Sequence, residues 1–455
     1  MVCESCAERN ADIITLTNPT DTSRQDEACV IKRKDLCAEN QKLVPVLKDK
    51  GGQYIPSQLD DLDGDGLWDE LAFVYNINEK EKLTLQLEWI DKASYPDFPV
   101  RTNVHYGKMK RPGLIEELTT DMHGKENLAR GGDDNNPYPY QTDGPSWEND
   151  KMGFRHYFDG RNCRDVFGKR IPDLVLDTVG IRPDGTPGDT YHVLRPWGRD
   201  IMSAANSFGL GGIAVQLPDT LLRMGVTIEE TVDNVDSTRY SLVCKGPVRS
   251  IFKLDFYGWQ MGNTKVDVHE TMTIWAGKYG YENEITTSPL PDNAVLVTGI
   301  VGNFNDMPQR LETYDRKVVS MSTHDRQTYN KEWYMGMSLI MPVSNYSDVF
   351  NAPDKGSDIL KTWCVKLKPN EEGKYLFNAY AAWELADEQF TNRDYYMNMI
   401  DSYARNMVNP VYNRNGNQVT ASLAVKYLDN QTMTTQVSQF NLVLEKNGEN
   451  WKIVK

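Results

Sequence analysis

The residues best suited to chemistry lie between Trp147 and Gly212. This stretch gathers arginine, histidine, tyrosine, tryptophan and aspartate between glycine-marked bends, as no other part of the chain does. A histidine beside a carboxylate can move protons near neutral pH, and an arginine can neutralise an anionic substrate. We therefore expect a reactive pocket here, on the condition that Tyr157 and His192 line one hollow.

The segment that begins at Met152 alternates in the manner of a strand with one buried face. Phe154 has one parity, and Arg155 and Tyr157 have the other, so these two side chains should project together. His156 shares the parity of the phenylalanine. A hydrogen-bonded histidine on the packed face is therefore favoured over a catalytic one.

The second half of the stretch is interrupted by Pro196 and Gly198, which are unfavourable inside a strand. The residues around this break, Trp197, Arg199 and Asp200, should lie on a loop, where side chains are free to face a ligand.

Composition narrows the classes of partner. The chain has 455 residues, 39% of them hydrophobic, and a formal net charge of −15. This size suits one large β domain with embellishments, or two domains. The acidic balance argues against nucleic acid as the main partner, and no apolar run is long enough to span a bilayer. The 10 Trp and 23 Tyr offer faces for sugar rings, although a large β core also uses them.

The most specific motif is an acidic loop of the form D-x-D-x-D-G-x-x-D. Its candidate ligands for a structural calcium ion are Asp61, Asp63, Asp65, the Leu67 carbonyl and Asp69. The loop is not a complete EF-hand, because Ala72 replaces the bidentate glutamate and the flanks resemble strands. We expect a calcium loop within a β-hairpin at residues 54–77, and the alternative is a solvated acidic turn without metal.

The sequence predicts an all-β protein: a large antiparallel β-supersandwich with long loops and one C-terminal helix. Strands are predicted at 12–17, 44–47, 54–58, 71–77, 79–89, 227–231, 237–244, 248–257, 264–276, 281–286, 295–302, 376–382, 419–427 and 439–445. A helix is predicted over 391–407, with a Thr391–Asp394 capping box and an apolar stripe through Tyr396 and Ile400. His269 should face outward from its strand, and His324 should lie in an exposed loop.

The predicted organisation has a flexible segment at 1–11, a main domain at 12–410 and a small β tail at 411–455. A loop-rich insertion at 96–145 should form a wall or lid near the central stretch. The seven cysteines fit no zinc or redox pattern. We interpret Cys3 as the acylated cysteine of a lipoprotein, with an unimportant residue of a polar tail as the alternative.

Several motifs together resemble one uncharacterised family. They are Ile55-Pro56-Ser57-Gln58, the acidic loop with Asp69-Glu70-Leu71, Tyr157-Phe158-Asp159-Gly160-Arg161-Asn162, Asp165-Val166-Phe167-Gly168 and Trp197-Gly198 with Asp200. This combination is similar to a family of bacterial envelope proteins (domain of unknown function four-eight-six-one). The resemblance covers most of residues 12–410. It implies a galactose-mutarotase-like fold, a periplasmic, outer-membrane-anchored or secreted location, and a part in glycan breakdown, sometimes of uronate-containing material. It brings no settled catalytic residues.

The leading hypothesis is a carbohydrate-active enzyme that acts on a uronate-containing oligosaccharide by β-elimination or hydrolysis. Elimination needs a cation on the uronate, a base for the α proton and an acid for the leaving oxygen. The candidates are Arg155, Arg195 or Arg199 for the cation, His192 for the base and Tyr157 for the acid, with Asp200 orienting His192. Hydrolysis needs two carboxylates, for which Glu148 with Asp200 or Asp159 is the best pair.

Two alternatives belong to other classes. One is a calcium-stabilised lipoprotein that binds glycans without turnover, with Trp147 and Trp197 as stacking platforms. The other is a sugar mutarotase or epimerase. If the protein is an enzyme, His192→Ala should abolish turnover while binding persists. If it only binds glycans, no product should form.

Overall fold

The computed structural model describes residues 13–36, 42–125, 139–226, 232–307, 309–356, 359–409, 412–415, 418–429, 434–447 and 450–453, the last four ranges by backbone alone. The chain divides into two compact units. The smaller unit comprises Met1–Asp60, Trp68–Phe98 and Asn409–Lys455, and the larger comprises Asp61–Leu67 and Pro99–Val408. The division falls at other residues than the boundaries 12–410 and 411–455 suggested by the sequence.

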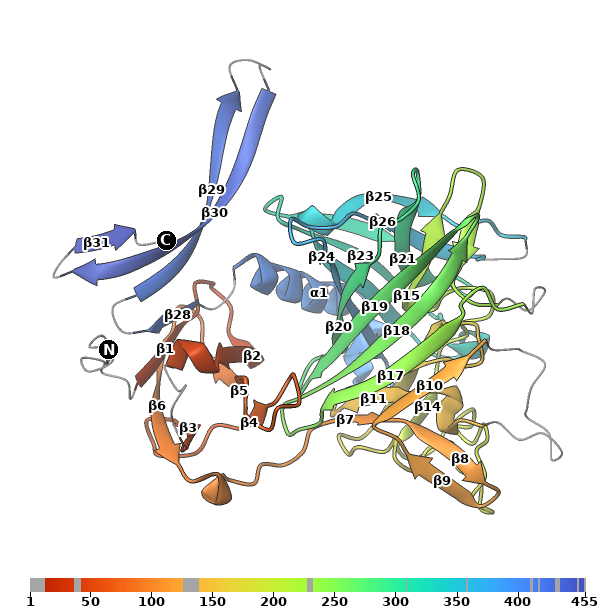
Figure 1. Ribbon diagram of the computed structural model, residues 1–455, viewed down its shortest axis with the longest axis horizontal. Helices are drawn as coiled ribbons and strands as arrows, with labels where there is room; N and C mark the ends of the chain where they lie inside the picture. The colour runs from red at the N-terminus through yellow and green to blue at the C-terminus, as the bar shows by residue number, and fades with distance from the viewer. Residues whose placement is uncertain are drawn as a thin grey trace. The chain divides into compact units, whose positions relative to one another are not determined.

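Three sheets, in which neighbouring strands pair antiparallel, dominate the larger unit (Figure 1). The first has nine strands in the order β10 (Thr120–Gly124), β17 (Ser237–Cys244), β18 (Arg249–Met261), β19 (Thr264–Trp275), β20 (Gly280–Thr287), β27 (Tyr375–Trp383), β24 (Met335–Pro342), β23 (Val318–Asp325) and β22 (Arg310–Tyr314). The second has five: β14 (Gly198–Asp200), β13 (Arg164–Lys169), β12 (Met152–His156), β11 (Ser146–Asn149) and β7 (Thr102–His105). The third has β16 (Leu221–Arg223), β15 (Leu210–Gln216), β21 (Val295–Val301), β26 (Thr362–Leu367) and β25 (Tyr346–Asn351).

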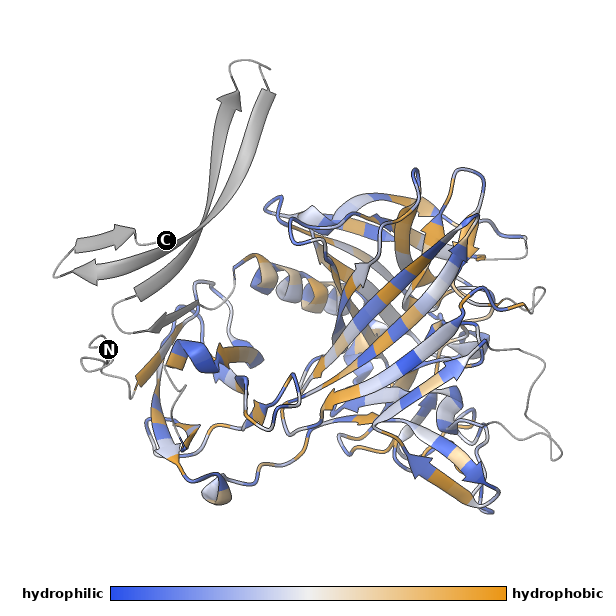
Figure 2. Ribbon diagram, viewed as in Figure 1, coloured by the Kyte–Doolittle hydropathy of each residue, from blue (hydrophilic) through white to orange (hydrophobic). Residues whose placement is uncertain are grey.

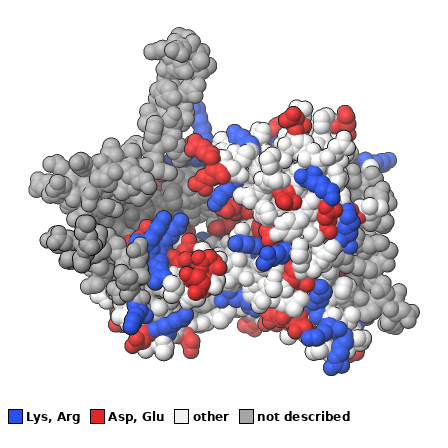
Figure 3. All heavy atoms as spheres, in the orientation of Figure 1, with Lys and Arg blue, Asp and Glu red and all other residues white. Residues whose placement is uncertain are grey.

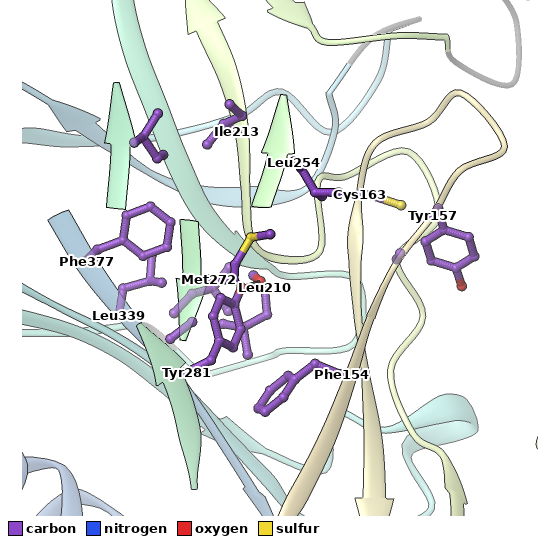
Figure 4. Packing of buried hydrophobic residues seen from close by; sticks show 14 of the residues in the cluster. Phe154, Tyr157, Cys163, Leu210, Ile213, Leu254, Met272, Tyr281, Leu339 and Phe377 are labelled. Atoms are coloured by element: carbon purple, nitrogen blue, oxygen red, sulfur yellow. Dashed lines mark hydrogen bonds between the residues drawn. The ribbon is translucent and has the colours of Figure 1, made fainter. Parts of the chain in front are cut away.

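One apolar core joins these three sheets into a sandwich. It contains side chains from each of them, such as Phe154 on β12, Ile213 on β15 and Phe252 on β18. Apolar and polar residues alternate along β18 and β19, as expected for strands with one buried face (Figure 2). Phe154 points towards Tyr281 of β20, with ring centroids 4.9 Å apart, whereas Tyr157 lies on the other side of its strand (Figure 4). This side is where the candidate site forms.

The single α-helix of the described residues, α1 (Arg393–Val408), covers part of the nine-stranded sheet. Its buried residues pack on side chains that point away from the main core, such as Ile340 and Tyr380. The predicted helix is confirmed, but its cap is not Thr391. The helix begins at Arg393, so the residue before it is Asn392, whose Oδ1 accepts the backbone N–H of Asp394 at 2.8 Å. Thr391 lies one residue earlier, and its hydroxyl donates to the Glu388 carbonyl.

One sequence-based expectation fails in this unit. His324 is buried rather than exposed, because β23 continues through it and its Nε2 lies 2.7 Å from the Phe390 carbonyl. In the described part of the predicted loop-rich segment 96–145, the strands β7 and β10 and the paired strands β8 (Gly107–Arg111) and β9 (Leu114–Glu117) lie between the loops. The predicted strand at 227–231 lies outside the described residues. His269 is exposed, as expected.

The smaller unit contains two sheets. A seven-stranded sheet has the order β3 (Val44–Lys48), β6 (Lys82–Ile90), β1 (Ile13–Thr17), β28 (Tyr412–Asn415), β29 (Gln418–Asp429), β30 (Thr434–Asn447) and β31 (Asn450–Ile453). The C-terminal strands thus extend a sheet that the N-terminal strands begin. A three-stranded sheet has the order β2 (Arg24–Lys32), β5 (Glu70–Ile77) and β4 (Ser57–Asp60), and the pairing of β4 with β5 confirms the predicted hairpin.

The fold class is therefore confirmed as mostly β and antiparallel, and the described residues contain one α-helix, near the C-terminus. Among the described residues no helix is long and apolar enough to cross a membrane. On the described part of the face in Figure 3, acidic and basic side chains are interspersed.

Candidate active site

The second sheet presents a row of charged side chains on the face opposite the apolar core. Strand pairing aligns them: Arg155 on β12 is the register partner of Asp165 on β13, and Phe167 on β13 is the partner of Asp200 on β14. Residues two apart on a strand share a face, so Arg155, Asp165 and Asp200 lie on the same side. Phe154 and Val166, of the other parity, belong to the core.

Arg155 is the centre of this row. It is fully buried, and its Nη2 donates to Asp165 Oδ2 at 2.6 Å and to Asp200 Oδ2 at 2.8 Å. Its Nη1 donates to Asp143 Oδ2 at 3.1 Å. The Tyr157 hydroxyl also contacts Arg155 and donates to Asp165 Oδ2 at 2.6 Å. The sequence-based expectation that Arg155 and Tyr157 project together is met.

His192 joins the same cluster from the loop before β14. Its Nε2 lies 3.3 Å from Asp200 Oδ2, and its side chain is 48% exposed while that of Asp200 is fully buried. A histidine that is paired with a buried carboxylate and also exposed to solvent has the arrangement of a general acid or base. The structure therefore brings together all four predicted catalytic residues, Arg155, Tyr157, His192 and Asp200.

Burial and charge shift the pKa values of this cluster. Removal from water, reinforced by the neighbouring Asp165, raises the pKa of Asp200 to about 6, against the opposing effect of Arg155. The hydrogen bond with Asp200 raises the pKa of His192 above its usual 6.5. Burial raises the pKa of Tyr157 well above 10, so this phenol stays protonated. At neutral pH the Asp200 carboxylate is ionised and can hold the His192 ring.

Asp200→Asn is expected to lower the pKa of His192, because an amide cannot stabilise the imidazolium as a carboxylate does. A proton titration of the histidine ring C–H signals by NMR measures this, with His192→Gln assigning the resonance. An unchanged or higher pKa in the variant would show that Asp200 does not control the protonation of His192.

His156 has the role that the strand parity favoured. It is buried, and its Nε2 lies 3.1 Å from Asn162 Oδ1. Burial lowers its pKa to about 3, so the ring is neutral at physiological pH. It is a core histidine rather than a catalytic one.

Two of the predicted substrate-binding residues are interior instead. The Trp147 ring has 0% exposure and packs against Phe154, so it presents no face to a sugar. Glu148 is also fully buried: it pairs with Lys169 Nζ at 2.6 Å and accepts the backbone N–H of Val175 and of Leu176 at 2.7 Å each. These contacts use both of its carboxylate oxygens.

The other predicted binding residues are less buried than Trp147 and Glu148. Arg195 is exposed, three positions after His192. Trp197 is half-buried and packs edge-on to Phe167. Arg199 lies over the rings of Tyr329 and Trp333, with its Cζ 5.9 Å and 5.5 Å from their centroids, and Nη1 pairs with Glu332 at 3.2 Å.

Sequence reasoning missed three members of the cluster: Asp143, Asp165 and Tyr191. Asp143 comes from the end of the 96–145 segment, and Tyr191 donates to its Oδ2 at 3.0 Å while lying under the Arg155 guanidinium. Asp165 was detectable, since Asp165, Phe167 and Lys169 alternate with Val166 and Gly168. Asp143 lies outside the strands β12 to β14, 12 residues before Arg155, and no strand alternation predicts its contact with Arg155.

The acidic loop brings three of its predicted ligands together. Carboxylate oxygens of Asp61, Asp63 and Asp65 lie within 4.8 Å of one another. Asp61 accepts the backbone N–H of Gly64 at 2.7 Å and of Gly66 at 2.8 Å, and both glycines have positive φ. The hydrogen bond from Gly66 is the main cause that lowers the pKa of Asp61. Three carboxylate oxygens at this separation suit a hard cation.

Comparisons with known proteins give distant relatives. The "Uncharacterized protein P7" of Formosa agariphila is 22% identical over 289 residues, which cover 59% of this chain and 62% of that protein. The chain thus spans less than two thirds of that relative. Two solved structures resemble the fold at 10% identity: an alpha-mannosidase from Enterococcus faecalis V583 and a protein in the Glycosyl Hydrolase Family 38 from Enterococcus faecalis. The first has a TM-score of 0.43 and covers 94% of this chain and 50% of its own. The second has a TM-score of 0.41 and covers 98% and 54%.

Two family models match the sequence. One, described as Conjugative transposon protein TcpC, matches only residues 382–454. The other matches residues 16–412, most of the chain including every residue of the candidate site. The protein therefore belongs to the family described as Domain of unknown function (DUF4861).

Proposed function

We propose that this protein is a carbohydrate-active enzyme that cleaves a uronate-containing oligosaccharide by β-elimination, with His192 as the base. The observation that carries the proposal is the pair of half-exposed His192 and fully buried Asp200, 3.3 Å apart within a cluster of tyrosine and arginine. Elimination begins with removal of the proton next to the uronate carboxylate. The imidazole of His192, whose pKa the hydrogen bond with Asp200 raises above 6.5, suits this step.

The cation that neutralises the substrate is Arg195 rather than Arg155. Three carboxylates, of Asp143, Asp165 and Asp200, already surround the Arg155 guanidinium. Arg155 therefore holds the cluster together. Arg195 is exposed near His192 in the chain, and none of the side-chain contacts among the described residues occupies it. A substrate carboxylate on Arg195 would bring the acidified proton towards the His192 ring.

Elimination is favoured over hydrolysis because the expected carboxylate pair is not free. Lys169 and two backbone amides engage Glu148, and Asp159 is bound to Arg161, with Oδ2 2.7 Å from Arg161 Nε. A glycosidase acid and base need access to the two faces of the glycosidic bond.

Incubation with a panel of plant and algal oligosaccharides tests the proposal. The expected products have the same summed mass as the substrate and a new absorbance from the unsaturated uronate. Products heavier by one water would instead identify a hydrolase, and an unchanged mass with changed anomer or epimer ratios would identify a mutarotase or epimerase. Binding without any product would support the glycan-binding alternative.

The location is a further part of the proposal: a periplasmic, outer-membrane-anchored or secreted protein, with Cys3 as the site of a lipid anchor. Cys3 lies outside the described residues. Mass spectrometry of the protein isolated from its native membranes would detect an acylated Cys3, and an unmodified N-terminal peptide would contradict the anchor.

We also propose that Asp61, Asp63, Asp65 and the Leu67 carbonyl, with Asp69 completing the motif, hold a structural calcium ion. Calcium is expected to raise the melting temperature of the protein by about 2–4 °C when it is near 10 times its Kd, by the mass action of native-state binding. The variant Asp63→Asn should lose most of this increase. Magnesium is the control, since its small octahedral shell fits poorly. A calcium-independent melting temperature would show that the loop is a metal-free acidic turn.

A further inference from the structure

The proposed elimination needs a proton donor for the leaving oxygen, and Tyr157 is poorly placed for this task. Its side chain is buried, and its hydroxyl already donates to Asp165 Oδ2 at 2.6 Å. The Arg155 and Arg161 guanidinium groups lie over its ring, at 4.3 Å and 4.4 Å from the centroid. A phenol in these contacts must break a charge-assisted hydrogen bond before it can reach a substrate.

A second tyrosine, Tyr329, lies next to His192. Tyr329 is half-buried, and its ring centroid lies 6.2 Å from that of His192. Among the described residues its hydroxyl makes no hydrogen bond, in contrast to that of Tyr157.

The Tyr329 segment is held firmly next to the site. The backbone N–H of Tyr329 donates to the Ile201 carbonyl at 3.2 Å, one residue after Asp200. Arg199 donates from Nε to the Asp200 carbonyl at 2.9 Å and lies over the Tyr329 ring. The following Asn330 has a φ of 57°, a conformation that L residues rarely adopt. The surrounding contacts therefore hold the tyrosine in a defined position near the histidine.

We propose that Tyr329 is the general acid that protonates the leaving oxygen, a role that rests on the proposed elimination. His192 takes the proton from the carbon next to the uronate carboxylate, and the electrons of that C–H bond form the new carbon–carbon double bond. The adjacent carbon–oxygen bond breaks, and its oxygen takes the proton of the Tyr329 hydroxyl. Exchange with water returns a proton to Tyr329 and removes one from His192, so no other reactant is consumed.

The electrostatics of the cluster agree with this role. Burial, and after it the negative charges of Asp200 and Asp165, raises the pKa of Tyr329 well above 10. The phenol is thus protonated at neutral pH, as an acid must be.

Leaving-group dependence tests the assignment. We expect Tyr329→Phe to lower kcat on a natural uronate oligosaccharide about 10²–10⁴-fold. On a synthetic uronate whose leaving group is a nitrophenolate, which departs without a proton, the loss should be less than about 10-fold. Tyr334→Phe is the matched control: it removes the hydroxyl of a half-buried tyrosine in the same segment, whose ring stacks on His324, and should change neither rate.

The outcomes separate the two proposals. If wild-type protein forms unsaturated product and Tyr329→Phe keeps full activity on both substrates, the assignment to Tyr329 is overturned while the elimination stands. The same holds if Tyr157→Phe alone shows the leaving-group dependence. If the wild-type protein forms no unsaturated product from either substrate, the proposed function fails, and the role of Tyr329 fails with it.

Discussion

His192→Ala is expected to lower kcat on a cleaved uronate oligosaccharide about 10²–10⁴-fold, the usual contribution of a positioned general base. KM should change little, because Arg195 and the aromatic surroundings still bind the substrate. The structural reason is that His192 alone among the four predicted catalytic residues has a substantially exposed side chain, at 48%. Steady-state kinetics from the absorbance of the unsaturated product measures both constants.

The chain contains a matched control for this variant. His269 is also exposed and also pairs with an aspartate, its Nδ1 lying 2.8 Å from Asp255 Oδ1, but it belongs to β19. His269→Ala should keep the full rate. Imidazole added to His192→Ala should restore part of the lost rate, because the replaced ring is open to solvent. Equal activity of His192→Ala and His269→Ala would contradict a base at His192.

The rate should also follow the protonation of His192. Only the neutral imidazole accepts a proton, and the hydrogen bond with Asp200 raises its pKa above 6.5. Activity is therefore expected to rise with pH through that raised value. In Asp200→Asn the rise should shift to lower pH, together with the pKa seen by NMR.

The second large effect concerns stability: Arg155→Met is expected to lower the free energy of unfolding by about 3–5 kcal/mol at pH 7.5. The substitution leaves Asp143, Asp165 and Asp200 beside one another without the buried cation that binds all three. Urea denaturation followed by tryptophan fluorescence measures the change. Removal of one partner from a buried ionic cluster costs far more than removal of an exposed ion pair.

The loss should become smaller as the pH falls. Without Arg155 the buried carboxylates have folded-state pKa values above those of the unfolded chain, so protonation below these values favours the folded state. The double variant Arg155→Met/Asp200→Asn should likewise recover part of the stability. Arg310→Met is the control, since Arg310 pairs with Asp401 at 2.7 Å at a partly exposed position and should cost less than about 1 kcal/mol. Similar losses for both arginines would contradict a central role for Arg155.

Much of the fold follows from local patterns. The strands predicted from 237 to 302 match β17 to β21, and the helix predicted at 391–407 matches α1. They could be predicted because apolar residues recur with a period of 2 in a strand and of 3.6 in a helix, a pattern visible among neighbouring residues. The parity of Met152 to Tyr157 also correctly separated Arg155 and Tyr157 from the packed His156. Errors arose where context decides burial, as for His324, whose ring is covered by a segment 66 residues away.

The sequence by itself determined which side chains share a face of a strand and that alternate aspartates crowd the 61–69 loop, because strand periodicity and turn-forming glycines are local properties. Only the tertiary structure decided which faces are covered. Pairing of β12, β13 and β14 aligned Arg155 with Asp165 and Asp200. A preceding loop added Asp143, a distant segment added Tyr329, and core packing enclosed Trp147. These contacts join residues of separate segments, and the free energy of sheet pairing and core burial selects them rather than any single segment.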